Sequence, residues 1–113
     1  MEFPVDQLDE VRVHVTELKL AEEAGLPYIL LSPLKLPAGC RPASVDALLS
    51  PTGRDGYTSR LFFAEKIACK RELNWNSVGV RILDRNWYAF SWKTNRENLR
   101  LLQMVLDHLA ALR

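Results

Sequence analysis

Cysteine and histidine are scarce in this chain, and that scarcity limits what the protein can be. Its 113 residues contain two cysteines, Cys40 and Cys69, and two histidines, His14 and His108. Two cysteines make no disulfide framework, and the four residues follow none of the spacings of a zinc motif. No glycine-rich phosphate loop occurs either. We therefore expect neither a metal site nor a bound cofactor.

Long apolar runs and an excess of one charge are also absent. No run approaches the roughly 18 apolar residues that cross a bilayer, and the start, Met1-Glu2-Phe3-Pro4, lacks the basic and apolar parts of a signal peptide. The net charge is +1, and the densest basic patch is Lys66, Lys70 and Arg71. Such a chain has no strong field to attract nucleic acid or a membrane. The sequence predicts a cytoplasmic protein that binds neither.

The length and composition are those of one folded domain. The chain is 48% hydrophobic and 26% charged, which is ordinary for a globular protein. A chain of this length can bury a core without disulfides or metal. We find no linker, repeat or low-complexity segment, so we expect residues 1–113 to form a single domain.

Four short apolar runs predict β-strands. The runs are residues 11–20, 28–36, 45–50 and 60–66, and turn signals separate them at Ala24-Gly25, Pro37-Ala38-Gly39 and Pro51 to Gly56. Strands joined in this way predict a four-stranded antiparallel meander.

Two details of these runs bear on their boundaries. Val11, Val13 and Val15 alternate with polar residues, which is the period of a half-buried strand. Pro33 and Pro37 bracket residues 34–36. Because proline cannot donate to a strand ladder, we expect an edge or a loop there.

Helices are expected at both ends of the chain. Residues 3–10 suit a short helix with Pro4 near its start. Near the other end, Thr94 and Glu97 form a capping-box signature. The leucines that follow at helical spacing are Leu99, Leu102, Leu106 and Leu109. They predict one apolar helix face that covers the sheet, and the fold class is therefore α+β.

Residues 67–93, between the last predicted strand and the final helix, are too many and too aromatic for a plain connector. Long loops are usually functional or disordered. The aromatic residues that argue against disorder here are Trp75, Trp87, Tyr88, Phe90 and Trp92. Residues 78–83 could add a short strand within the loop. We expect the aromatic side chains after residue 86 to pack the loop against the final helix.

Cys69 is the strongest candidate for chemistry. It follows the fourth predicted strand and precedes Lys70 and Arg71, and neighbouring cations favour the nucleophilic thiolate. The competing interpretation is a small buried hydrophobic residue, which free cysteine often is. Cys40 lies in a turn and is predicted to be a half-buried structural cysteine.

Asparagines and histidines offer weaker candidates. Asn74 and Asn76 flank Trp75, and an asparagine amide can stabilise an oxyanion, although both positions also suit a turn. His14 alternates with valines and is expected on a polar strand face. His108 is expected to be a solvated helix residue.

Several short motifs, in a fixed order, resemble the ubiquitin-conjugating enzyme (UBC) superfamily, and within it the prokaryotic ubiquitin-conjugating family E. They are Leu36-Pro37-Ala38-Gly39, Asp46-Ala47-Leu48-Leu49, Gly56-Tyr57, Leu61-Phe62-Phe63 and Asn86-Trp87-Tyr88-Ala89-Phe90-Ser91-Trp92. The family reads similarly: a Leu-Pro-x-Gly segment, a strand, a Gly-Tyr-Pro turn, an aromatic strand, a tryptophan-rich segment and a leucine-rich helix. The resemblance covers residues 28–112.

The resemblance implies a UBC-like fold and a function in a bacterial ubiquitin-like conjugation pathway. Members accept a ubiquitin-like protein from an activating enzyme as a cysteine thioester and pass it to an amine. Related bacterial genes lie in operons with both partners, and several are linked to antiphage defence. In this resemblance Cys69 stands in the active-site loop, as the candidate nucleophile of a transferase.

Two departures from the family leave a second function open. The His-Pro-Asn that precedes the family's cysteine is replaced here by Lys66-Ile67-Ala68, and Thr58 stands where proline usually follows Gly-Tyr. The oxyanion asparagine has no matched position, and only Asn74 and Asn76 could supply one. The alternative is a non-catalytic UBC-fold scaffold, like the variant and RWD-type members, that binds a ubiquitin-like protein or an activating enzyme.

Overall fold

The sheet and its two helices form an α+β structure, as predicted. The structure, a computed structural model, describes residues 3–93 and 98–113. The elements are α1 (Val5–Arg12), β1 (Val15–Glu23), β2 (Leu26–Lys35), β3 (Ser44–Ser50), β4 (Arg60–Phe63), β5 (Trp75–Ile82), β6 (Arg85–Phe90) and α2 (Leu101–Ala110). The described helices are not long and apolar enough for either to cross a membrane.

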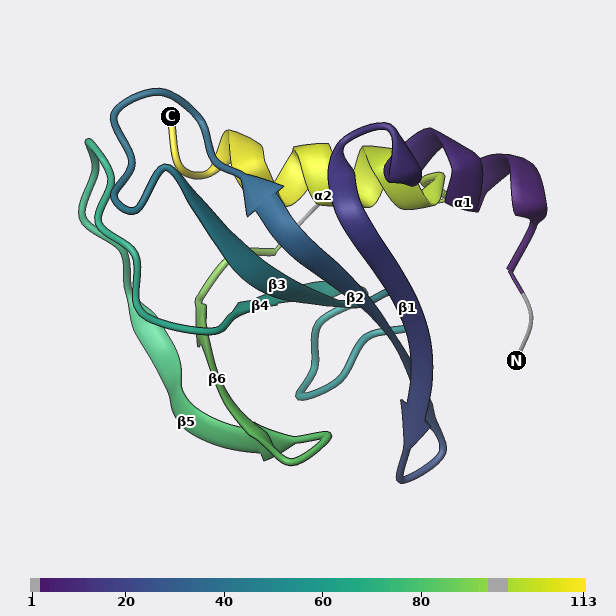
Figure 1. Cartoon of the computed structure of the whole chain (residues 1–113). Coiled ribbons are helices and arrows are strands. Elements are labelled where there is room, and N and C mark those ends of the chain that lie inside the picture. The colour runs from purple at the N-terminus through teal and green to yellow at the C-terminus, as the bar shows by residue number, and fades with distance from the viewer. Residues whose placement is uncertain (1–2, 94–97) are drawn as a thin grey trace.

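The strands form one curved antiparallel sheet that carries both helices on one face (Figure 1). The strand order is β1-β2-β3-β4-β6-β5, so the first four strands are the predicted meander. The prediction of four strands in all is wrong, because β5 and β6 form a hairpin that joins the sheet through β6. The helices cover the meander, and α1 packs against α2.

The first helix begins and ends two residues later than predicted and displaces the start of the first strand. Pro4 is the N-cap, and Leu8 and Val11 are buried on one helix face. Val13 is 82% exposed, so the alternation of Val11, Val13 and Val15 was a wrong basis for a strand. Leu8 and Val11 are three residues apart, and this helical spacing determines which side chains reach the core.

The predicted edge or loop at residues 34–36 is wrong for Leu34, which pairs with both β1 and β3, and for Lys35, the last residue of β2. Leu36 lies after the strand, as predicted. The pairing of β2 with β3 changes register between Leu31 and Leu34. Pro33 lies within this irregularity, where a missing backbone N–H removes no regular ladder bond.

The loop predicted at residues 67–93 is largely a β-hairpin. Its two-residue turn consists of Leu83 and Asp84, with φ angles of 52° and 62°. Two consecutive positive φ values are those of a type I′ turn, whose twist suits adjoining antiparallel strands. The short strand predicted at residues 78–83 is therefore the end of the longer β5.

Apolar side chains alternate along the strands between two cores. The core beneath the helices includes Leu49, Phe63 and Phe90, whereas the opposite face holds a smaller cluster. That cluster consists of Tyr28, Leu48, Phe62, Ile82, Trp87 and Ala89. The prediction that Trp87 packs the loop against the final helix is thus wrong. Trp87 faces away from the helices, and its Nε1 donates to the Ile82 carbonyl at 3.0 Å.

The final helix is confirmed, but it presents a different face to the core. Its buried apolar residues are Leu101, Val105 and Leu109, whereas Leu106 is 45% exposed. The predicted capping box of Thr94 and Glu97 lies outside the described residues. The start of the helix is instead fastened to α1, because the Leu101 N–H donates to Gln7 Oε1 at 3.1 Å.

Replacement of Gly53 should weaken the fold more than replacement of nearby Gly56. Both glycines have positive φ, +81° and +88°, so alanine strains the backbone by about 1–2 kcal/mol at either position. A Cβ on Gly53 would also lie 1.9 Å from the Tyr57 carbonyl oxygen, whereas a Cβ on Gly56 meets no atom within 4 Å. We expect urea unfolding to show a loss of about 3 kcal/mol or more for Gly53→Ala. Equal losses for the two variants would contradict this structure of the turn.

Candidate functional site

Cys69 lies in the segment that connects β4 to β5, where a short antiparallel bridge fixes the backbone. The Arg41 N–H donates to the Ala68 carbonyl at 2.7 Å, and the Ala68 N–H donates to the Arg41 carbonyl at 2.9 Å. This bridge joins the turn after β2 to the segment after β4. It therefore brings the neighbours of both residues together, and these neighbours are Cys40 and Cys69.

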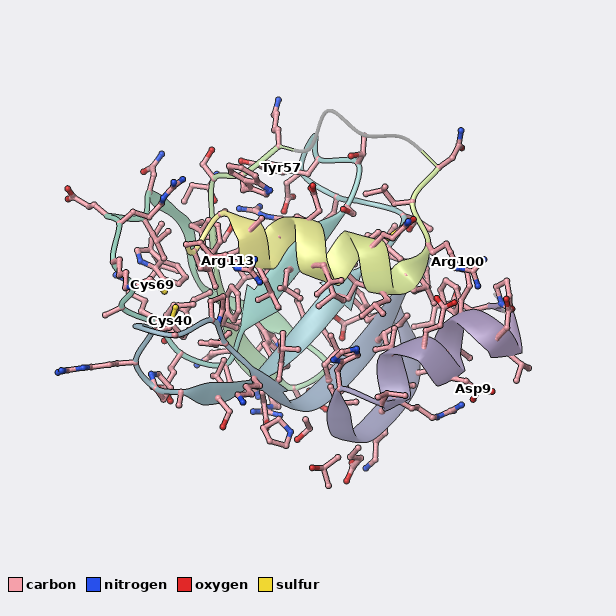
Figure 2. The ribbon with its side chains drawn as sticks, turned by 90° about the horizontal axis from the view of Figure 1, so that it is seen from above. Asp9, Cys40, Tyr57, Cys69, Arg100 and Arg113 are labelled. Atoms are coloured by element: carbon pink, nitrogen blue, oxygen red, sulfur yellow. The ribbon has the colours of Figure 1, made fainter. Side chains whose placement is uncertain are left out.

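The two cysteine side chains are in contact, as Figure 2 shows. The Sγ atoms of the buried Cys40 and the half-buried Cys69 lie 2.6 Å apart. Burial, together with the contact with Cys40, raises the pKa of Cys69 to about 12. The expectation that Lys70 and Arg71 favour the thiolate is thus not met. At neutral pH Cys69 is a protonated thiol, which is a poor nucleophile.

An open hollow of about 340 Å³ lies beside Cys69. Trp75 and Leu73 provide apolar walls, and Arg71 and Glu72 provide charges of opposite sign. The other lining residues are Ile67 and Ala68. The Cys69 side chain therefore borders a surface that another molecule can reach.

Neither predicted oxyanion residue contributes its amide to Cys69 among the described hydrogen bonds. Asn76 Nδ2 donates to Tyr57 Oη at 2.7 Å, and Asn76 Oδ1 accepts from Arg60 Nη2. Asn74 is exposed, and its backbone carbonyl accepts from the Ser91 N–H at 2.7 Å. Trp75, between the two, packs against the core beneath the helices. Because side chains alternate along an extended chain, the asparagines lie on the other side from Trp75.

The amide of Asn76 belongs instead to a polar cluster that the sequence analysis missed. Its centre is Arg60, which is 3% exposed. The Arg60 guanidinium lies 4.3 Å from the centre of the Tyr57 ring and 5.4 Å from that of Phe62. Its Nη1 also donates to Asp55 at 3.4 Å. The sequence contained one signal of this cluster, because Arg60 is a charged residue at the start of an otherwise apolar strand.

The cluster changes the acidity of its phenol. Tyr57 Oη donates to Ser91 Oγ at 3.3 Å and accepts the bond from Asn76. The hydrogen bond with Ser91, then the bond from Asn76 and the charges of Arg60 and Lys93, lower the pKa of Tyr57. Figure 2 shows that Tyr57 and the cysteine pair lie apart. Within the residues that the structure describes, the Tyr57 cluster and the cysteine pair are therefore two separate polar features.

His108 is buried, which corrects the prediction of a solvated helix residue. Its Nε2 lies 2.9 Å from Ser59 Oγ. A serine and a histidine at this distance can act as nucleophile and base, but the two residues are only 5% and 3% exposed. A substrate therefore cannot reach them. Burial, with the positive charge of Arg60, lowers the pKa of His108 to about 4.

A second surface feature is an apolar groove of about 200 Å³ between α2 and the end of β2. Leu102 and Leu106 contribute apolar surface, and the cationic Lys35 and Arg113 and the imidazole of His14 line it as well. The remaining lining residues are Leu34, Leu36, Pro37, Val105 and Leu109. No acidic side chain is among these lining residues, so the groove suits a segment that is apolar and negatively charged.

Metal coordination has no support in the described part of the chain. No three side chains of histidine, cysteine, aspartate or glutamate come together there as potential ligands.

Comparisons with protein-family models, with curated proteins and with solved structures find no match for this chain.

The burial of His108 predicts a specific pH dependence of stability. Between pH 6.5 and pH 4 the unfolded chain binds the imidazole proton and the folded chain does not. The contribution of neutral His108 is therefore complete above pH 6.5 and is lost as the pH falls toward 4. The full loss is on the order of 3 kcal/mol.

Urea unfolding at pH 7 and pH 4.5 measures this loss. His108→Gln, which cannot titrate, should lose less stability between the two pH values than the wild type. The exposed His14→Gln is the matched control and should behave as the wild type. The same loss in all three proteins would show that His108 is not the group responsible.

Proposed function

We propose that this chain is a UBC-like module of a ubiquitin-like conjugation pathway, and that it binds a pathway protein without carrying a thioester. The proposal that the chain carries no thioester rests on the protonation state of Cys69. Its thiol is half-buried, contacts Cys40 and has a pKa raised to about 12. A thioester carrier needs a reachable thiolate, which this environment disfavours.

The surroundings of Cys69 also support binding rather than transfer. A transferred acyl group develops negative charge that an amide donor would stabilise. The side-chain amide of Asn76, one of the two candidate oxyanion donors, is already hydrogen-bonded to Tyr57 and Arg60. Transfer chemistry would therefore require a donor from elsewhere.

The order of elements supports the UBC-like part of the proposal. The resemblance implies a four-stranded meander with a loop after its fourth strand and a helix beneath. In this chain β1 to β4 are paired in order, the Cys69 segment follows β4, and α2 packs under the sheet. Leu36-Pro37-Ala38-Gly39 connects β2 to β3, and Gly56-Tyr57 precedes β4.

The groove beside α2 is the surface that we assign to the partner. Leu106 is 45% exposed there, although it lies on a helix of a folded domain. Lys35 and Arg113 provide positive charge. The occupant is an apolar, acidic segment of the ubiquitin-like protein or of the activating enzyme, because that chemistry complements both features.

One observation favours the second candidate, a ubiquitin-like-protein transferase. Cys69 lines an open hollow and is not sealed in the core. A partner that inserts into this hollow could separate Cys69 from Cys40 and so lower the pKa of the thiol. In that case Cys69 would accept the ubiquitin-like protein as a thioester and pass it to an amine.

A charging experiment distinguishes the two candidates. The protein is mixed with ATP and with the activating enzyme and the ubiquitin-like protein encoded in its own operon, where the resemblance places them. The products are separated on a non-reducing gel. We expect the activating enzyme to become charged and this chain to form no thiol-sensitive adduct. An adduct that is lost in Cys69→Ala but kept in Cys40→Ala would overturn the binding proposal and establish the transferase.

A binding experiment tests the groove. We expect calorimetric titration of the chain to detect binding of the ubiquitin-like protein or of the activating enzyme, and Leu106→Glu to weaken it by about tenfold or more. The new carboxylate replaces apolar surface and repels an acidic segment. Val78→Glu, at another exposed apolar position on β5, is the matched control and should bind normally. Equal affinity in the two variants would exclude the groove, and absence of binding to both partners would refute the proposed function.

A further inference from the structure

The contact between Cys40 and Cys69 has a use that the proposed function does not include. The two residues lie 29 positions apart in the sequence, and their Sγ atoms are 2.6 Å apart. Both thiols are free. Packing alone would be satisfied by any two small apolar side chains, so the pairing of two thiols calls for a chemical explanation.

The backbone around the pair has the register of a cross-strand site. Arg41 and Ala68 exchange both backbone hydrogen bonds, at 2.7 and 2.9 Å. In an antiparallel bridge the next residues on each side, here Cys40 and Cys69, form a non-hydrogen-bonded pair. Such pairs have Cα atoms about 4.5 Å apart, which is within the range that a disulfide spans. A covalent bond between these residues requires no rearrangement of the backbone.

We propose that Cys40 and Cys69 are a reversible dithiol–disulfide pair, oxidised by exchange with a small disulfide such as oxidised glutathione. The two thiols differ in access. Cys69 borders the open hollow beside Trp75, whereas Cys40 is buried. Cys69 is therefore the residue that meets the oxidant, and Cys40 is the residue that resolves the intermediate.

The exchange balances in two steps. The small fraction of Cys69 that has lost its proton attacks one sulfur of oxidised glutathione, so the exchange is slow at neutral pH and becomes faster as the pH rises. The glutathione disulfide breaks, a mixed disulfide forms, and the released glutathione thiolate takes up the proton. Cys40 then attacks Cys69 Sγ, and the second glutathione leaves as a thiol with the Cys40 proton. The protein has lost two electrons and two protons, and one oxidised glutathione has become two reduced ones.

Oxidation would join covalently two segments that the Arg41–Ala68 bridge already connects through backbone hydrogen bonds. These segments are the turn before β3 and the connection from β4 to β5. The bond would remove the Cys69 thiol from any acyl transfer. It would also restrict the unfolded chain, which stabilises the folded state. The inference holds for either candidate function, because it needs only the two thiols and their register.

The test is incubation of the native protein with oxidised glutathione, followed by alkylation in denaturant and measurement of the intact mass. The wild type should lose the mass of two hydrogen atoms, take up no alkyl group and recover both thiols with dithiothreitol. Its thermal midpoint should rise by about 10 °C on oxidation. Cys40→Ala lacks the resolving thiol and should stop at a single glutathione adduct on Cys69.

Other outcomes would overturn the proposal. They are a lasting glutathione adduct on the wild type, a disulfide-linked dimer on a non-reducing gel, or no reaction while the protein remains folded. The wild-type measurement decides the matter even if Cys40→Ala does not fold. Charging and groove binding use different readouts, so failure of the disulfide is distinguishable from failure of the proposed function.

Discussion

The rest of the structure depends on β4, a strand of only four residues. β4 pairs with β3 on one side and, through Phe63 and Tyr88, with β6 on the other. It is therefore the junction between the meander and the hairpin. All four of its side chains are buried. Leu61 and Phe63 enter the core beneath the helices, and Phe62 enters the opposite core. Phe63 stacks on Phe90 at 5.9 Å, which joins the two halves of the sheet by side-chain contact as well.

The same short strand introduces a charge into the interior, and the neighbouring segments compensate it. Burial lowers the pKa of Arg60 and would disfavour its charged form, while Tyr57 and Asp55 oppose that shift. The ring of Tyr57 and the carboxylate of Asp55 both come from the turn that Gly53 shapes. A desolvated cation over an aromatic ring gains about 2 kcal/mol, so the turn has an energetic reason to fold against β4. Burial is the main cause of the neutral state of His108, and the positive charge of Arg60 acts in the same direction.

Local patterns in the sequence were sufficient to predict most helices and strands, but not to predict which face of each one is buried. The strand at 45–50, the strand at residues 60–63 within the predicted run 60–66, and the last helix were predictable, because each is a short apolar or periodic segment. The leucines and the valine of α2 cover a broad arc on one side of its axis, so the sequence permits more than one core face within that arc. The sheet selects Leu101 and Val105 and leaves Leu106 exposed. The hairpin was hidden for a different reason, since Leu83 and Asp84 adopt positive φ without the glycine that normally signals a type I′ turn.

The candidate site shows where local reasoning reaches its limit. Lys70 and Arg71 are adjacent to Cys69 in the sequence, and they suggested a thiolate. The pKa of a thiol depends on what surrounds the sulfur in space, and there Cys69 meets Cys40, 29 residues away. Burial and that contact outweigh two cations whose side chains are exposed to solvent. The position of a cysteine in the expected loop therefore says less about catalysis than the groups that surround its sulfur in space. In this chain those surroundings favour the protonated thiol over the thiolate.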